Sequence, residues 1–174
     1  MPNKIKVLVT GGAGYIGSCT SNILLDKGHD VTIIDNLTVG KIKLLPKKAK
    51  FHKFNIQNKK KLSNLLSKNN FDIVFHFAAF ISVEDSVNYP KKYLKNNYDN
   101  TKIFLEIFRK FNLKNIIFSS TAAVYGDVKS FNANENFKKK PQNPYAISKL
   151  RVEEHLINSK FFKYIILRYF NVVG

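Results

Sequence analysis

Two short segments carry residues whose types and spacing could perform proton chemistry. Tyr145 and Lys149 lie four residues apart, so on a helix they share one face. Ser119, Ser120 and Thr121 follow an apolar run, and the Thr121 hydroxyl could hydrogen-bond a reacting oxygen. A phenol is a poor base at neutral pH because its ordinary pKa is about 10, but a nearby ammonium favours the phenolate. Tyr145 could then take a hydroxyl proton while hydride leaves the same carbon, and return it later.

A glycine-rich turn near the amino terminus is typical of a dinucleotide site. Gly11, Gly14 and Gly17 follow an apolar segment and open a helix-like one. The free N–H groups at a helix start favour a pyrophosphate, and glycines let the backbone approach it. Asp35 ends the next apolar segment, where its carboxylate can accept hydrogen bonds from ribose hydroxyls and would repel a 2′-phosphate. These features predict bound NAD rather than NADP.

Simpler explanations exist for each of these features alone. The glycines fit an ordinary tight turn, Asp35 a surface turn, and the pair of Tyr145 and Lys149 a solvated helix face. Their order along one chain favours a single site over these alternatives. His76, by contrast, we expect to be a hydrogen-bonded residue at a strand end rather than a base.

Length and composition exclude several other classes of protein. A chain of 174 residues is about one domain, and no apolar run approaches the ~20 residues that cross a bilayer. Cys19 is the only cysteine, which excludes an intrachain disulfide, and the four histidines show no ligand spacing, so we expect no metal site. The first residues lead directly into a strand-like segment and leave no room for a signal peptide, so a cytoplasmic location is expected.

The net charge of +17 raises the question of nucleic-acid binding. Nearly all of the cationic side chains are lysines; only Arg109, Arg151 and Arg168 are arginines. Because base recognition favours the planar arginine side chain, we expect no nucleic-acid partner. The positive field would still attract anionic ligands such as nucleotides.

The elements that must position these residues alternate between strand and helix. Helices are predicted over residues 18–27, 59–67 and 82–111, the last restarting near Pro90, and a polar connection over 126–144 leads to the helix of Tyr145. Strands are predicted over residues 5–9, 31–34, 51–54, 73–77, 115–119 and 164–167. This alternation predicts one α/β domain over residues 1–174: a Rossmann-type, doubly wound parallel sheet covered by helices on both faces, with ligands at the carboxyl ends of its strands.

Several segments together resemble the extended short-chain dehydrogenase/reductase family. The likeness covers essentially the whole chain and is most specific for the branch that epimerises UDP-hexoses at C4. The matching segments are residues 9–18, 35–37, 76–79, 93–97, 118–126, 145–149 and 167–171.

The resemblance implies NAD-dependent epimerisation of a UDP-hexose through a transient 4-keto sugar. Tyr145 would be the acid/base, Lys149 its electrostatic partner, and Thr121 would help to position the sugar oxygen. The UDP-sugar would contact Asn171 as well as Tyr145 and Thr121. Besides the three glycines, Tyr145 and Lys149, the residues implied to contact NAD are Tyr15, Ile16, Asp35, Asn36, Asn55, Ile56, Phe77, Ala78, Ala79, Asn96 and Phe170.

Departures from the family pattern narrow the chemistry. Ala122 and Ala123 stand where the family's dehydratases carry an acidic pair, which argues against dehydration. The same two alanines do not exclude the decarboxylases or the other sugar epimerases of the family. Asn55 replaces the usual aspartate beside adenine and can hydrogen-bond without charge, and Ile81 stands where some epimerases have a lysine.

The family continues into a smaller carboxyl-terminal substrate domain that this chain lacks. We therefore expect a truncated or split protein that binds NAD but is weak or inactive alone. The expected partners are a UDP-sugar, a second copy in a homodimer and a separate carboxyl-terminal half, with no membrane partner. The alternatives are another NAD-dependent nucleotide-sugar epimerase or decarboxylase, and a non-catalytic NAD-binding fragment that needs a partner chain.

Overall fold

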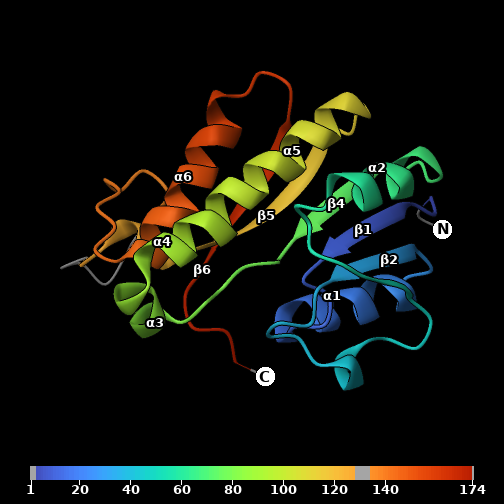
Figure 1. Ribbon diagram of the computed structural model, residues 1–174, viewed down its shortest axis with the longest axis horizontal. Helices are drawn as coiled ribbons and strands as arrows, with labels where there is room; N and C mark the ends of the chain where they lie inside the picture. The colour runs from blue at the N-terminus through green and yellow to red at the C-terminus, as the bar shows by residue number, and fades with distance from the viewer. Residues whose placement is uncertain (1–2, 128–133, 174) are drawn as a thin grey trace.

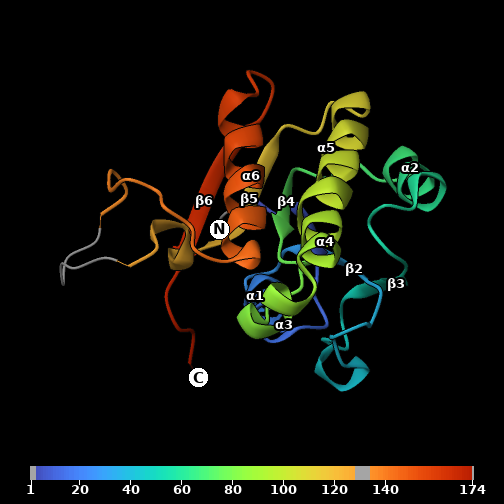
Figure 2. The same cartoon turned by 60° about the vertical axis from the view of Figure 1, so that its left-hand side comes forward.

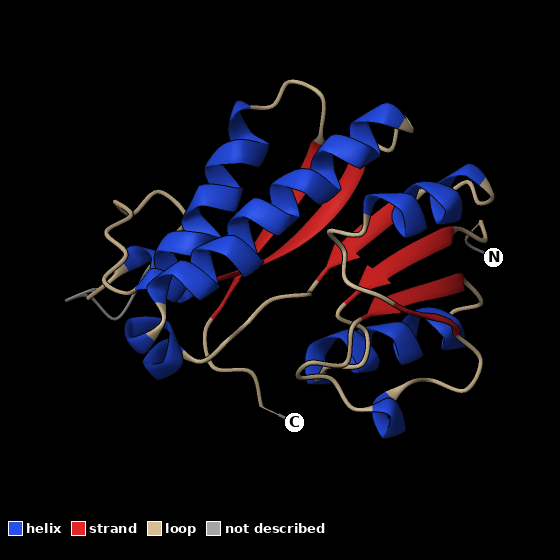
Figure 3. Ribbon diagram, in the orientation of Figure 1, coloured by secondary structure: helices blue, strands red, loops and turns tan. Residues whose placement is uncertain are grey.

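The computed structural model describes residues 3–127 and 134–173 of the chain. In them, six strands form one parallel sheet with the order β3-β2-β1-β4-β5-β6 (Figure 3). This arrangement confirms the predicted doubly wound sheet of Rossmann type. The strands are Lys6–Thr10 (β1), Asp30–Asp35 (β2), Lys50–Lys53 (β3), Ile73–His76 (β4), Asn115–Thr121 (β5) and Lys163–Tyr169 (β6).

Helices pack on both sides of the sheet, but unevenly. The longer ones are Tyr15–Asp26 (α1), Lys59–Ser67 (α2), Asn100–Lys110 (α5) and Pro144–Asn158 (α6). Helices α2, α5 and α6 lie together over one face, whereas α1 lies on the other face beneath β1 and β2 (Figures 1 and 2). Shorter segments are Ile42–Leu44 (η1), Val83–Asn88 (α3), Pro90–Tyr93 (α4), the π-helical Leu94–Asp99 (η2) and Ala122–Tyr125 (η3).

Some observed boundaries differ from the predicted ones for physical reasons. The first helix begins at Tyr15 instead of residue 18, because the amide of Ser18 already donates to the Gly14 carbonyl (2.9 Å). Strands β5 and β6 run longer than predicted because they pair up to Thr121 and Tyr169. The predicted helix over 82–111 is interrupted, with a new start at Pro90 as expected. Within the predicted connection over 126–144, residues 128–133 lie outside the described part of the chain.

The main core fills the space between the sheet and helices α2, α5 and α6. Leu8 and Phe118 of the sheet meet Phe104 and Phe108 of α5 and Leu156 of α6, all of them almost completely buried. Burial of side chains of this size contributes about 1.5–3 kcal/mol each. The core therefore holds the strands in a fixed arrangement and fixes the positions of the loops at their carboxyl ends.

Among the described residues, the helices that flank the sheet leave one face of β5 and β6 uncovered. Within residues 3–127 and 134–173, no helix lies over the side of these two strands that faces away from α5 and α6 (Figures 1 and 2). Ile165 of β6 points to that side and is 56% exposed, whereas its neighbour Ile166 packs against the main core. Ile117 of β5 pairs with Ile165 in register, so an apolar strip crosses both strands.

Two further findings concern only the described residues. No helix among them is both long and apolar enough to span a bilayer. They also contain no group of three or more His, Cys, Asp or Glu side chains that could hold a metal ion.

Candidate cofactor and active site

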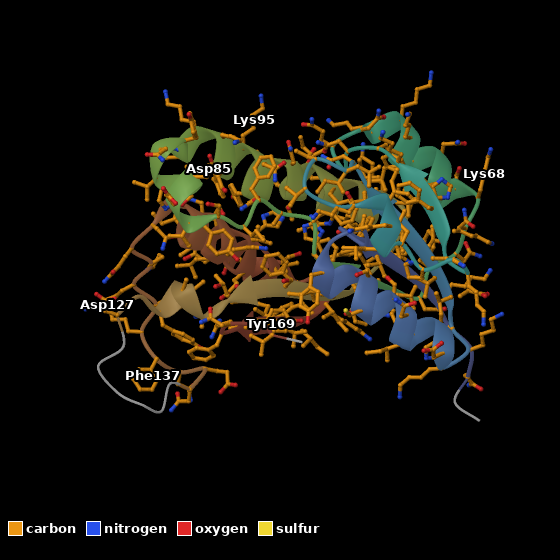
Figure 4. All side chains as sticks on the ribbon, turned by 90° about the horizontal axis from the view of Figure 1, so that it is seen from below. Lys68, Asp85, Lys95, Asp127, Phe137 and Tyr169 are labelled. Atoms are coloured by element: carbon orange, nitrogen blue, oxygen red, sulfur yellow. The ribbon has the colours of Figure 1, made fainter. Side chains whose placement is uncertain are left out.

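A pocket of about 940 Å³ lies at the carboxyl ends of the strands. The strand order reverses between β1 and β4, which is where open α/β sheets bind their ligands. Seen from below, Tyr169 at the end of β6 lies near the middle of the molecule, and Asp85 and Lys68 lie towards opposite ends (Figure 4). The pocket brings together every site residue predicted from the sequence: Gly11, Gly14, Tyr15, Ile16, Gly17, Asp35, Asn36, Asn55, Ile56, Phe77, Ala78, Ala79, Asn96, Thr121, Tyr145, Lys149, Phe170 and Asn171.

The glycine turn fits closely between its neighbours. Gly11 has φ +72°, and a Cβ on it would lie only 2.6 Å from the backbone nitrogen of Ala78. A Cβ on Gly17 would overlap the carbonyl oxygen of Gly11. Gly14 caps α1 without a side-chain hydrogen bond, so the first N–H groups of the helix point to the pocket edge without such a partner. The turn therefore offers backbone donors and a helix dipole to an anionic group.

Asp35 is fixed at the end of β2 beside this turn. The residue is only 7% exposed, and its Oδ2 accepts a hydrogen bond from the Ala13 amide (3.0 Å). Its Oδ1 accepts from the Leu37 amide (2.8 Å). Because each carboxylate oxygen can accept a second hydrogen bond, Asp35 retains acceptor capacity towards the pocket.

The loop that follows Asp35 also reaches the pocket, although the sequence motifs did not predict it. Residues 38–41 line the pocket, and the Lys41 amide donates to the carbonyl of Ala13 (2.9 Å). A Cβ on Gly40 would lie 2.7 Å from the Cβ of Ala13 and 3.0 Å from Oδ2 of Asp35. The glycine at this position was the only signal of that close approach in the sequence.

His76 is a buried polar bridge behind the pocket. Its Nδ1 lies 2.6 Å from Thr10 Oγ1, and its Nε2 lies 2.9 Å from Thr101 Oγ1. The ring stacks on Phe104 and Phe118. Burial lowers the pKa of His76 to about 3, and the charge of Lys149 acts in the same direction. The imidazole is therefore neutral near pH 7, which confirms the expectation of a hydrogen-bonded strand-end residue.

Tyr145 occupies the first turn of α6. Asn143 caps this helix by accepting a hydrogen bond from the Ala146 amide (2.8 Å), with Pro144 in the first turn. Burial raises the pKa of Tyr145, a hydrogen bond with Thr121 lowers it, and the charge of Tyr93 raises it. The side chain is therefore a phenol at neutral pH in this structure, and Thr121 is its hydroxyl neighbour.

Lys149 reaches the pocket from the next turn of α6 and is only 3% exposed. Its Nζ donates a hydrogen bond to the Ser119 carbonyl (2.8 Å) and lies 5.1 Å from the centre of the Phe118 ring. Burial lowers the pKa of Lys149 to about 7, and the charge of Glu153 opposes this shift. The fraction of Lys149 that is charged at neutral pH therefore depends on its surroundings.

The π-helical segment η2 joins the loop after β4 to the helix of Tyr145. Asn97 accepts a hydrogen bond from the Phe80 amide (2.8 Å) and donates to its carbonyl (2.9 Å). The same side chain donates to Ser148 Oγ (3.1 Å), which in turn donates to the Tyr145 carbonyl (2.6 Å). Asn96, the neighbour of Asn97, lines the pocket. Single π-helical turns often occur at functional sites, and here one holds two pocket walls together.

Comparison with known proteins gives a consistent picture. The model of the NAD dependent epimerase/dehydratase family matches residues 7–174. A UDP-glucose 4-epimerase of Lacticaseibacillus casei is 42% identical over 173 residues, which cover 98% of this chain and 52% of that protein.

Solved structures agree with the sequence match. The UDP-glucose 4-epimerase of Thermotoga maritima with UDP-glucose has a TM-score of 0.91 and 36% identity, covering 98% of this chain and 57% of that one. The enzyme of Brucella ovis in complex with NAD has a TM-score of 0.92 and 35% identity, covering 96% and 52%. The chain thus spans about half the length of the curated relatives it matches.

Proposed function

Because this chain belongs to the NAD-dependent epimerase/dehydratase family, we propose that it is the NAD-binding part of an enzyme that epimerises a UDP-hexose at C4. One observation carries the proposal. Tyr145, Lys149 and Thr121 line the same pocket as the glycine turn and Asp35. Groups for proton transfer and groups for holding a dinucleotide therefore share one cavity.

The pocket residues suit NAD. The turn can pack this closely because Gly11 and Gly17 have no side chains, and the start of α1 would offer N–H donors to a pyrophosphate. Asp35 would accept hydrogen bonds from ribose hydroxyls and disfavour a 2′-phosphate. When bound, NAD supplies the hydride exchange at C4 of the sugar that a 4-keto intermediate requires.

In this mechanism the chain's own side chains handle the proton. Tyr145 would take the proton of the C4 hydroxyl and return it after the sugar presents its other face. Thr121 would hydrogen-bond the reacting oxygen, and the Lys149 ammonium would favour the phenolate form of Tyr145. Burial raises the pKa of Tyr145, so this positive charge is needed for the phenol to act as a base at neutral pH.

The residues after Thr121 favour epimerisation over dehydration. Ala122 and Ala123 line the pocket within η3, where Thr121 Oγ1 accepts a hydrogen bond from the Ala123 amide (3.2 Å). Methyl groups at these two positions cannot donate or accept a proton. Elimination of water would need an acid and a base near the sugar, so we assign the chain to the epimerases of the family.

We also propose that residues 1–174 form one NAD-binding domain and that further polypeptide supplies the rest of the sugar site. Phe170 and Asn171 lie at the pocket edge, and both are exposed. They would contact the nicotinamide and the UDP-sugar. Because the chain matches only about half of each relative, we propose that the chain alone binds NAD with weak or no turnover.

Two measurements test the proposed function. Nucleotide bound to the purified chain is identified first, and interconversion of UDP-glucose and UDP-galactose is then assayed with and without a polypeptide that supplies the carboxyl-terminal half. We expect bound NAD, weak or no turnover by the chain alone, and turnover with the second half. Tyr145→Phe keeps the ring and removes the hydroxyl, so it should lower turnover at least ~100-fold while NAD stays bound. Full activity of Tyr145→Phe would contradict the role of Tyr145 as acid/base. Robust turnover by the chain alone would contradict the proposal that further polypeptide completes the sugar site.

A further inference from the structure

A buried ion pair lies directly behind Lys149. Glu153 is 0% exposed, and its Oε1 and Oε2 accept hydrogen bonds from Nε (3.0 Å) and Nη2 (2.8 Å) of Arg168. The Ser120 hydroxyl also donates to Glu153 Oε1. Arg168 Nη1 in turn donates to the Tyr125 hydroxyl (2.7 Å). The carboxylate of α6 is thus held by donors from β5 and β6, and the arginine is tied to η3.

This pair is set apart from the pocket. Glu153 and Arg168 do not line it, whereas Lys149 and Ser120 do. Neither member of the pair is therefore placed to touch a bound molecule. A buried ion pair is weak evidence for stability, because the cost of desolvating two charges can exceed their attraction. The pair therefore calls for an explanation other than stability alone.

Lys149 and Glu153 lie four residues apart on α6, so they share one face of the helix. Both are buried, where charges interact more strongly than in water. The negative charge of Glu153 raises the pKa of Lys149 against the effect of burial.

The other neighbours of Lys149 contribute little negative charge. From β4 comes His76, which is neutral near pH 7, and β5 supplies the Ser119 carbonyl and the Phe118 ring. Tyr145 on α6 is a phenol, and Arg168 on β6 carries a positive charge that is paired with Glu153. Where η2 meets α6, the hydrogen-bonded side chains are the uncharged Asn97 and Ser148.

We propose that Glu153 is a positioning residue that keeps Lys149 charged in the pocket, that Ser120 holds the Glu153 carboxylate, and that Arg168 shares its charge and so limits its effect on Lys149. That the Lys149 charge stabilises the Tyr145 phenolate rests on the proposed function. The effect of Glu153 on Lys149 does not, because it needs neither cofactor nor substrate.

The test is to titrate Lys149 in the full chain without added ligand. Lysine ε-carbons are labelled with ¹³C, and the Lys149 signal is identified by its loss in Lys149→Met. In Glu153→Gln the pKa of Lys149 should fall by about one unit or more, because the counter-charge is gone and the Arg168 charge remains. In Arg168→Gln it should rise, because the Glu153 charge is no longer shared. Glu154→Gln, the neighbouring exposed carboxylate, is the matched control and should change nothing.

The expected shifts of the Lys149 pKa have opposite signs in Glu153→Gln and Arg168→Gln, so a general effect of mutation cannot produce both. A Lys149 titration in Glu153→Gln that matches Glu154→Gln would overturn the proposal, whether or not the chain binds NAD or acts on a UDP-sugar. If Glu153→Gln does not fold, Glu153→Asp and Arg168→Gln decide. The aspartate keeps the charge and should leave the pKa of Lys149 near that of the parent chain. A pKa that falls in Glu153→Asp, or does not rise in Arg168→Gln, would equally contradict the role of Glu153.

Discussion

Lys149 and His76 are both buried beside the pocket, and burial lowers the pKa of each side chain. The pKa of His76 falls to about 3, so its ring serves only as a neutral partner for Thr10 and Thr101. The pKa of Lys149 falls to about 7, so its charge is adjustable at neutral pH. Two residues with similar burial thus have different roles, because the pKa of Lys149 lies near neutral pH and that of His76 lies far below it.

The low pKa of His76 predicts a loss of stability in acid. The unfolded imidazole takes up a proton below about pH 6.5, and the folded one does so only near pH 3. The free energy of unfolding should therefore decrease as the pH falls from 6.5 towards 3, by up to about 1.4 kcal/mol per pH unit. Urea unfolding at several pH values should show a smaller decrease in His76→Gln, which does not titrate.

The matched control is His52→Gln on the edge strand β3, which should follow the parent chain. An equal decrease in the parent chain and in His76→Gln would mean that the folded protein protonates His76 as easily as the unfolded one does.

At the scale of elements, the strands and their order along the chain could be predicted because every strand except β3 contains a short apolar run. The length of β5 could not, because it depends on pairing with β6 up to Thr121 and Tyr169. Local sequence also does not show which face of a strand a helix covers. Ile165 and Ile166 look alike in the sequence, yet one is exposed and the other packs on the core.

This difference between neighbouring residues gives a test of the open face of β6. Threonine keeps the β-branched shape that strands favour and replaces the ethyl group of isoleucine with a hydroxyl. Ile165→Thr should change the free energy of unfolding by less than about 0.5 kcal/mol, as exposed substitutions do. Ile166→Thr should lower it by about 1–2 kcal/mol, because it removes core contacts. Equal losses in urea unfolding would show that the Ile165 face is covered in solution.

At the scale of the whole molecule, one pocket brings together all the residues that we propose to contact NAD, with Asn171, proposed to contact the UDP-sugar, at its edge. Many of the proposed cofactor residues could be predicted because they lie in short motifs that follow a strand, whereas Asn96 lies in η2 and Tyr145 in α6. The loop of residues 38–41 could not, because it reaches the pocket only through its contacts with Ala13 and Asp35. Under the proposed function, the chain binds NAD without the residues that complete the sugar site. Cofactor binding and turnover are therefore separable properties.

Binding of NAD compared with NADP tests the central claim most directly. Binding is measured by titration calorimetry on the purified chain after bound nucleotide has been removed. Physiological ionic strength limits the general attraction of a +17 chain for anions. We predict one saturable NAD site per chain and at least ~10-fold weaker binding of NADP. Asp35→Asn should reduce this preference, whereas Asp30→Asn at the exposed start of the same strand should not. A folded chain that shows no saturable NAD binding, or that binds NADP as tightly as NAD, would contradict the assignment of this pocket.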